Sequence, residues 1–213
     1  MNTKTLSVAA ILAAALSLAG CAAGTATTPS HGMDHGSSSP MSSMMPDASA
    51  DHNAADIMFS QMMIPHHAQA VEMSDLMLAK TGIPAPVTSL ATRIKAAQAP
   101  EIEQMTGWLE TWNQPTMTGH TMPGGGMSGM VSAEDLRKLT SAQGDEAVKL
   151  FLTQMVAHHE GAIAMARTEV DAGKFAETIE LAKAIITSQQ AEIEEMKQLL
   201  AALCPPQALG STA

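Results

Sequence analysis

Apolar side chains recur along this chain in alternating steps of three and four residues, the period of a helix with one buried face. In the first such stretch the positions run from Phe59 through Met63, His66 and Ala70 to Met77. Glycine and proline residues interrupt the pattern and mark where each stretch ends. The pattern predicts four long helices, at about 54–80, 86–112, 145–172 and 174–203.

A shorter helix is predicted before the third long one. Ser132 is followed by Ala-Glu-Asp, which is typical of a capped helix start, and the helical pattern continues to about Leu139. The residues between the halves of the chain, 113–131, are rich in glycine and threonine and have no apolar period. We therefore expect a loop there, of a length that is more often functional than passive.

The chain contains an internal repeat. The stretch with His66 and His67 returns at a constant offset as the stretch with His158 and His159, and the flanking apolar positions match as well. The segment that begins at Gln98 in the second helix likewise returns in the fourth, so each half, 54–112 and 132–203, is predicted to be an αα-hairpin. Because neither hairpin can bury its apolar face alone, the expected fold is an all-α antiparallel four-helix bundle made of two repeated hairpins.

The helical period separates the two histidines of each copy. His66 and His158 fall on the apolar stripes and are predicted to be buried. His67 and His159, about 100° further round the helix, are predicted to lie on the flank and to be less buried. Gln98 is a polar residue on an otherwise apolar stripe, so we expect it to meet His66 across the bundle. The residues expected to support the histidines in this way are Gln98, Glu101, Gln189 and Glu192.

Residues 1–20 are typical of an export signal. Lys4 precedes an apolar run that is shorter than the roughly 20 residues of a membrane span. The run ends in Leu-Ala-Gly-Cys21, which resembles a bacterial lipobox and predicts acylation of Cys21 and attachment to a membrane through that lipid. The alternative is an ordinary secretory signal that has a cysteine after its cleavage site. Either way we expect an exported protein of the bacterial cell envelope, on the periplasmic or cell-surface side.

Residues 21–53 form a predicted flexible tether, and 204–213 a short tail. The tether consists largely of small and polar residues with methionine and histidine, a composition that cannot bury enough surface to fold. If Cys21 carries lipid, Cys204 has no partner for an internal disulfide.

Composition restricts the function further. The chain has 11 Lys and Arg against 21 Asp and Glu, which disfavours a nucleic acid partner. It also has 18 methionines, an unusual number. Methionine sulfur and histidine nitrogen together favour soft or borderline transition ions, and the thioether tips the choice to copper, with Cu(I) favoured over Cu(II). Met62 precedes His66 by four residues and Met63 precedes His67 by four, so on a helix each pair can share one ion.

Methionine and histidine also gather in the tether and in the 113–131 loop. This composition suits auxiliary capture of a soft metal, although a low-complexity spacer is the alternative. The candidate residues are His31, Met33, His35, Met117, His120, Met122, Met127 and Met130.

No catalytic constellation is found in the sequence, so we expect the protein not to be an enzyme. The Glu-x-x-His spacing of di-iron bundles is missing at both histidine pairs, which makes a redox or iron enzyme the weakest alternative. A stronger alternative is a structural or partner-binding bundle, in which His66 and His158 only satisfy hydrogen bonds in the core.

The motif Phe59-x-x-x-Met-Ile-Pro-His66-His67-x-x-Ala-Val-x-Met73, and its copy from Phe151 to Met165, resemble the signature of the domain-of-unknown-function family 305. The resemblance covers most of the chain outside the tether and the middle loop. It implies a ferritin-like four-helix bundle in an exported family, some members of which bind copper. The metal ligands that it implies are Met63, His66, His67, Met73, Met155, His158, His159 and Met165.

The second copy has Ala157 where the first has Pro65, so equal geometry at the two sites is not expected. The function that the sequence predicts is an extracytoplasmic copper-binding protein. It would sequester the ion, or hand it to a copper-handling protein of the envelope, without catalysis.

Overall fold

The structure is a computed structural model that describes residues 51–117 and 127–203. The predicted signal peptide, Cys21, the residues His31, Met33 and His35 of the tether, His120 and Met122 of the loop, and the tail lie outside the described residues.

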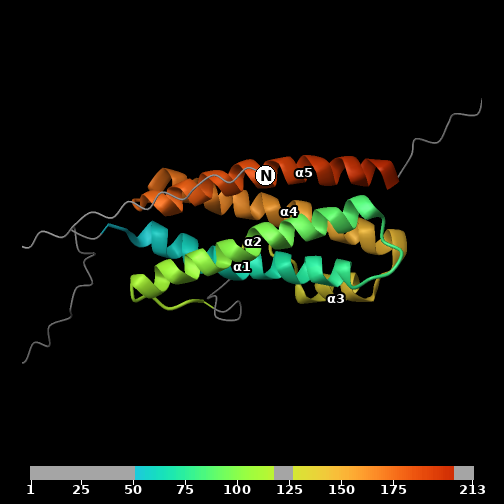
Figure 1. The fold of residues 1–213 in the computed structure, drawn as a ribbon, viewed down its shortest axis with the longest axis horizontal. Coiled ribbons are helices and arrows are strands. Elements are labelled where there is room, and N and C mark those ends of the chain that lie inside the picture. Colours follow the sequence, from blue (N-terminus) through green and yellow to red (C-terminus); the bar gives the residue numbers. More distant parts are fainter. Residues whose placement is uncertain (1–50, 118–126, 204–213) are drawn as a thin grey trace, which may run out of the picture. The chain divides into compact units, whose positions relative to one another are not determined.

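The described residues form five helices and no strand, which confirms the all-α fold class (Figure 1). Their bounds differ from the sequence prediction by one or two residues. None of the helices in the two described ranges is both long enough and apolar enough to cross a membrane. The helices are α1 (Ala54–Leu78), α2 (Ala85–Thr111), α3 (Ala133–Ser141), α4 (Gly144–Ala172) and α5 (Ala176–Leu203).

Side chains at the helix ends explain where the helices begin. Asn53 caps α1, accepting hydrogen bonds from the backbone N–H groups of Ala55 and Asp56, while the Asp56 carboxylate accepts from the Asn53 backbone. Ser132 caps α3 by accepting from the Asp135 backbone, as the sequence predicted. The helix α1 continues through Pro65 without interruption.

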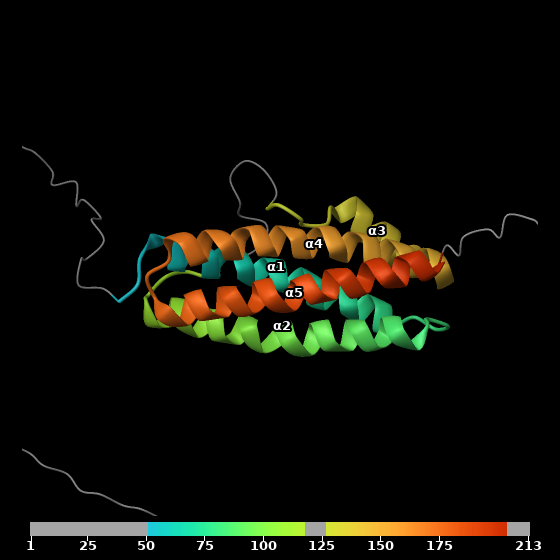
Figure 2. The ribbon, with the colours of Figure 1, turned by 90° about the horizontal axis from the view of Figure 1, so that it is seen from above.

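The two hairpins pack through α1 and α4. The helix α1 packs mainly on α2, and α4 mainly on α5, while α1 and α4 form the main contact between the halves (Figures 1 and 2). The start of α1 lies at the end of α4, where Asn53 Nδ2 donates to the Ala172 carbonyl at 2.9 Å. Its far end lies near the start of α4, where Lys80 Nζ donates to the Ala142 carbonyl at 2.8 Å. The two central helices are therefore antiparallel.

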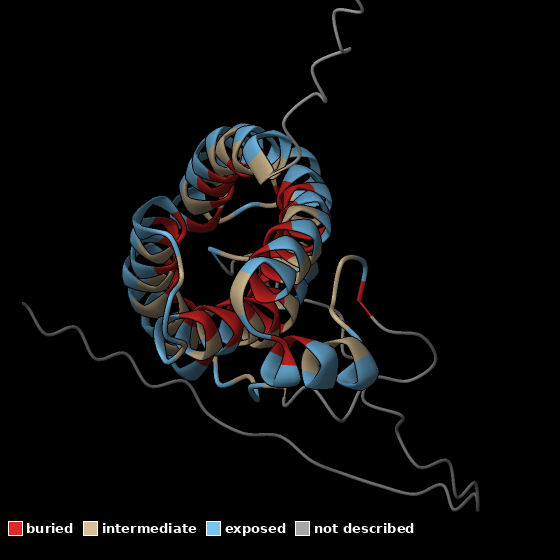
Figure 3. Cartoon of the chain, turned by 90° about the vertical axis from the view of Figure 1, so that its right-hand side faces the viewer, coloured by how far each residue is buried: buried red, intermediate tan, exposed pale blue. Residues whose placement is uncertain are grey.

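Methionine fills much of the bundle core. The buried residues lie on the inward sides of the helices when the bundle is seen from its end (Figure 3). Methionine is flexible and fills irregular gaps, which suits a core with few aromatic residues. The methionines that are completely buried are Met63, Met73, Met77, Met105, Met155 and Met196.

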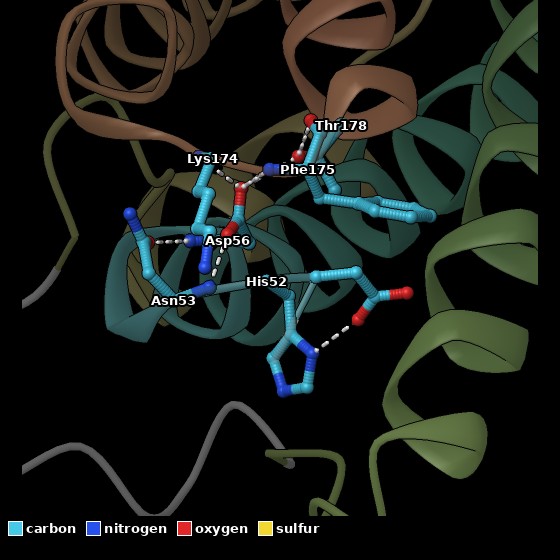
Figure 4. A network of polar contacts seen from close by, with 7 residues as sticks. His52, Asn53, Asp56, Lys174, Phe175 and Thr178 are labelled. Carbon is cyan, nitrogen blue, oxygen red and sulfur yellow. Dashed lines mark hydrogen bonds and ion pairs between the residues drawn. The ribbon is translucent and has the colours of Figure 1, made fainter. Parts of the chain in front are cut away.

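A polar network joins α1 to the α4–α5 connection (Figure 4). The buried Asp56 carboxylate accepts hydrogen bonds from the backbone N–H groups of Lys174 and Phe175 and from the Thr178 hydroxyl, each at 2.9 Å. These bonds run between the first helix of repeat one and the second hairpin. Since an unpaired buried carboxylate would be costly, the network fixes how the two repeats meet at this end.

Next to this network lies a second carboxyl group, that of Glu169 on α4, which is 1% exposed. Burial raises the pKa of Glu169 to about 7, and the adjacent Asp56 carboxylate adds to the rise. Burial acts in the same direction on Asp56, but the Glu169 carboxyl and the backbone donors outweigh it and lower the pKa of Asp56. Near neutral pH the pair thus shares one negative charge, held on Asp56.

Candidate metal centre

Two histidines meet where α1 crosses α4. His66 and His158 are both completely buried, as predicted, and their ring centroids lie 3.7 Å apart with an interplanar angle of 39°. They are equivalent residues of the two repeats, so the pseudo-two-fold axis of the repeat passes between their rings. The sequence predicted the burial of each, and the structure shows that they contact each other.

The outer histidines are also completely buried, and the prediction that they would be less buried is wrong. The reason is that α1 and α4 each have a long-helix neighbour on two sides, so adjacent positions on each helix are both covered. His67 Nε2 lies 2.7 Å from Glu101 Oε2 on α2, and His159 Nε2 lies 2.7 Å from Glu192 Oε2 on α5. Each hairpin therefore contains an equivalent histidine–carboxylate pair.

The expected bond between His66 and Gln98 is not formed. His66 Nε2 instead lies 3.3 Å from the carbonyl oxygen of Ser128. The Oε1 atoms of Gln98 and Gln189 are buried without a hydrogen-bond partner among the described residues. Glu101, which was predicted to support the histidines, contacts His67.

Five buried imidazole nitrogens lack a hydrogen-bond partner within the described ranges. They are Nδ1 of His66, His67, His158 and His159, and Nε2 of His158. An unsatisfied buried polar atom costs on the order of 1–3 kcal/mol, so this concentration is unusual for a core that serves structure alone.

The inner histidines are held in the neutral form. Burial, followed by the charges of the neighbouring histidines, lowers the pKa of His66 to about 3 and that of His158 well below its usual value. A neutral imidazole has a free lone pair on one nitrogen, which is the form that binds metal ions.

The outer histidines are oriented in a way that suits metal binding. Each carboxylate accepts a hydrogen bond, so the proton of His67 lies on the nitrogen facing Glu101, and the proton of His159 on the nitrogen facing Glu192. The lone pair is left on Nδ1, which is buried and unpartnered in both rings. A carboxylate behind a histidine is the usual second layer of protein metal sites, where it fixes the ring and raises its basicity.

The last residues of the middle loop, 127–131, cover the inner histidines. Val131 exchanges two hydrogen bonds with the Gln69 side chain on α1, at 2.8 and 3.0 Å. On α4, a Cβ atom at Gly161 would lie 2.0 Å from the Ser128 carbonyl oxygen, so only glycine permits this approach. Gly129, with φ of 84°, packs against the same turn of α4.

The predicted methionine ligands fall into two groups. Met63, Met73 and Met155 are completely buried in the bundle core. Met62 and Met165 are only partly buried, and both line a groove of about 250 Å³ on the surface between α1 and α4. Met58, which the sequence analysis did not single out, lines the same groove and is 60% exposed. Its signal in the sequence was its position one turn before Met62.

The loop methionines that the structure describes have different environments. Met127 is 8% exposed and therefore buried, whereas Met117 and Met130 are half-buried. No three His, Cys, Asp or Glu side chains of the described residues converge on a point where they can hold an ion.

This fold and site define a class of protein: an all-α bundle of two repeated hairpins, with paired histidines buried on the repeat axis. The chain belongs to the family described as domain of unknown function DUF305, whose model matches residues 56–200.

Solved structures of this family resemble the chain along most of the bundle. A DUF305 protein from Streptomyces coelicolor described as secreted is 35% identical, with a TM-score of 0.65 over 70% of this chain and 92% of that one. A DUF305 fragment from Deinococcus radiodurans is 31% identical, with a TM-score of 0.63 over 70% of this chain and 97% of that one. None of the curated proteins matches.

A third similar protein is CopM, solved with metal ions. In its Cu(I)-bound form it is 31% identical to this chain, with a TM-score of 0.58 over 69% of this chain and 96% of CopM. CopM was also solved with Cu(II) and with silver. The family resemblance predicted from the histidine motifs is thus confirmed.

Proposed function

We propose that this protein binds copper, with Cu(I) favoured over Cu(II), at the buried histidine centre, and that it sequesters the ion or passes it on without catalysis. The observation that carries the proposal is the set of five unpartnered imidazole nitrogens around the crossing of α1 and α4. Copper would satisfy atoms that otherwise remain buried and unbonded.

The chemistry of the donors supports a soft ion. The inner rings are neutral because burial depresses their pKa, so the protein need not release protons from them to take up a cation. Met63 and Met155 are buried in the turn before the histidines of each copy and supply thioether sulfur. Sulfur of this kind favours Cu(I) over harder ions. Structures of CopM with Cu(I), Cu(II) and silver support the same ion class.

We propose an extracytoplasmic location for this activity. The secreted description of the Streptomyces relative and the export signal predicted at residues 1–20 support it. Attachment through a lipid on Cys21 would hold the bundle at the membrane, where it could exchange copper with a copper-handling protein of the envelope.

A competition titration tests the proposal. The mature protein is titrated with Cu(I) against a chelator of known affinity, alongside the double variant His66→Gln/His158→Gln. We expect the variant to lose affinity by about 10-fold or more, because two imidazole donors are removed. His52→Gln is the matched control, since His52 lies outside the centre and stacks on Trp112 instead.

The second candidate function is a structural or partner-binding bundle. The bonds from His67 to Glu101 and from His159 to Glu192 favour it, because they tie the helices of each hairpin together without any ion. Copper affinity that is unchanged in His66→Gln/His158→Gln, together with a lower melting temperature, would contradict copper binding at the histidines and support this alternative.

A further inference from the structure

The two ends of the contact between α1 and α4 are related by the repeat, but they are covered differently. At one end α3 packs on the contact (Figure 2). There Gln154 Nε2 donates to the Asp135 carbonyl at 3.1 Å, and Leu139 of α3 is completely buried. Leu136 and Leu150 pack against the same core cluster. Repeat one has no counterpart of α3 among the described residues.

The groove of Met58, Met62 and Met165 lies at the other end of this contact, which none of the described helices covers. By the register of the repeat, these residues correspond to Leu150, Gln154 and Met73. The covered side therefore has one thioether at these three positions, whereas the open side has three. An exposed apolar groove would normally be covered or carry polar residues, and here Met58 is 60% exposed.

The geometry brings the three sulfur-bearing side chains to one place. Met58 and Met62 are one helical turn apart on α1, so they share a face, and Met165 approaches from α4. Phe59 forms an apolar wall of the same groove, which has a volume of about 250 Å³.

A carboxyl group lines the groove beside the methionines. Glu169 is 1% exposed, and its carboxyl lies beside Asp56 and Thr178 as well as along the groove. A cation in the groove would favour loss of the proton that Glu169 holds near neutral pH, because an opposite charge nearby stabilises the ionised carboxylate. The groove thus combines neutral soft donors with one carboxyl group that a bound cation would help to ionise.

We propose that Met58, Met62 and Met165 form a second metal site, open to solvent, that binds a soft monovalent cation such as Cu(I) or Ag(I) through thioether sulfur. Thioethers select soft ions, and harder divalent ions find only one carboxyl group there. This site shares the ion class with the proposed function but uses no histidine, so neither site requires the other. Because this site is exposed, it can bind an ion directly from solvent, whereas the histidine centre is buried.

The site is tested by silver titration of the mature protein, because Ag(I) has the same softness and is not oxidised in air. The groove variant is Met58→Leu/Met62→Leu/Met165→Leu, in which leucine keeps the apolar volume and removes the sulfur. Met77→Leu is the matched control, since Met77 is completely buried in the core. Melting temperatures check that each variant folds.

We expect the groove variant to bind one Ag(I) fewer than the wild type and the Met77→Leu control. We also expect the ε-methyl NMR signals of Met58, Met62 and Met165 to shift on titration of the wild type. Unchanged stoichiometry in the groove variant, with ε-methyl signals that do not move, would overturn the inference.

Comparison with His66→Gln/His158→Gln separates this inference from the proposed function. If the groove variant loses an ion and the histidine variant loses none, the result supports the groove site and contradicts metal binding at the histidines. If the histidine variant loses binding and the groove variant does not, the result contradicts the groove site and supports the proposed function.

Discussion

At the scale of single residues, the two histidines of each motif have different surroundings. The inner pair, His66 and His158, contact each other across the repeat axis with their rings tilted. The outer pair each contact a carboxylate of the neighbouring helix at 2.7 Å. The inner rings therefore provide donors without charge, and the outer rings are oriented by an anion.

The carboxylates behind the outer rings should control copper affinity. Glu101→Gln keeps the shape of the side chain and removes its charge, so we expect copper affinity to fall by about 10–100-fold, the usual effect of losing such a partner. Glu103→Gln is the control, because Glu103 is exposed on the same helix. Equal affinities for the two variants in the chelator competition would contradict a role for Glu101 in metal binding.

The inner histidines should make the metal-free protein sensitive to acid. The pKa of His66 is about 3 in the folded state, whereas an ordinary histidine in the unfolded chain titrates near 6.5. As the pH falls below 6.5, the unfolded state binds protons that the folded state excludes, so stability falls from that pH down towards about 3.

Urea unfolding across this pH range measures the effect. In His66→Gln/His158→Gln the slope of stability against pH should be smaller, since glutamine does not titrate. A slope identical to that of the wild type would show that the inner rings are not held neutral.

Glu169 should have the opposite effect at higher pH. Its folded pKa is raised to about 7 from 4.5, so the folded state binds the extra proton between these values. The resulting stability is fully present below 4.5 and is lost as the pH rises through about 7.

Glu169→Gln imitates the protonated carboxyl and removes this loss. We expect the variant to be more stable than the wild type at about pH 8, by on the order of 1–3 kcal/mol, and nearly equal to it at about pH 5. Glu160→Gln, at an exposed position of the same helix, should change stability little at either pH. A variant less stable than the wild type at both pH values would contradict the protonated state.

At the scale of elements, residues 127–131 act as a cover over the histidine centre. They are held by Gln69 on α1 and by the close approach to Gly161 on α4. The Ser128 carbonyl, through its contact with His66, connects this segment directly to the site. Opening the centre on this side requires the segment to move.

Gly161→Ala should displace the segment. The new Cβ would lie 2.0 Å from the Ser128 carbonyl oxygen, so the backbone must shift and the contact with His66 is lost. We expect a loss of about 1–3 kcal/mol in stability and faster copper exchange, measured by stopped-flow transfer to a chelator. Gly107→Ala is the control, because a Cβ there meets nothing within 4 Å and alanine favours the helix. Slower exchange in Gly161→Ala would contradict this role of the segment.

At the scale of the whole molecule, the bundle is two hairpins that complete each other. The buried faces of α1 and α4 pack on one another, and the Asp56 network joins α1 to the second hairpin. The histidine centre lies on this contact, so its inner half exists only when both repeats are present.

A single repeat should therefore not fold as a monomer. A fragment of residues 51–117 would expose Phe59, Met63 and Met73, which are buried in the intact chain. We expect the fragment to be unfolded or to self-associate in analytical ultracentrifugation with circular dichroism. A folded, monomeric fragment would contradict the mutual dependence of the repeats.

Much of this arrangement was predictable because it depends on local periodicity. The helices, the repeat and the burial of His66 and His158 all follow from the spacing of apolar residues along one helix face. The role of Glu101 was predicted only in part, since the sequence placed it near the histidines but did not specify which of them it contacts. Met58 was missed, because its position one turn before Met62 becomes significant only when a second helix brings Met165 to the same groove.

The sequence by itself determined the helices, the duplication of the hairpin and the family, because each depends on residues close together in the chain or on their repetition. Only the tertiary structure decided which neighbour each polar group meets. It buried His67 as well as His66, placed the Ser128 carbonyl against His66, and left the groove of Met58, Met62 and Met165 open on one side. Such contacts depend on how two helices distant in sequence cross and on what covers their junction, and helical periodicity does not specify either.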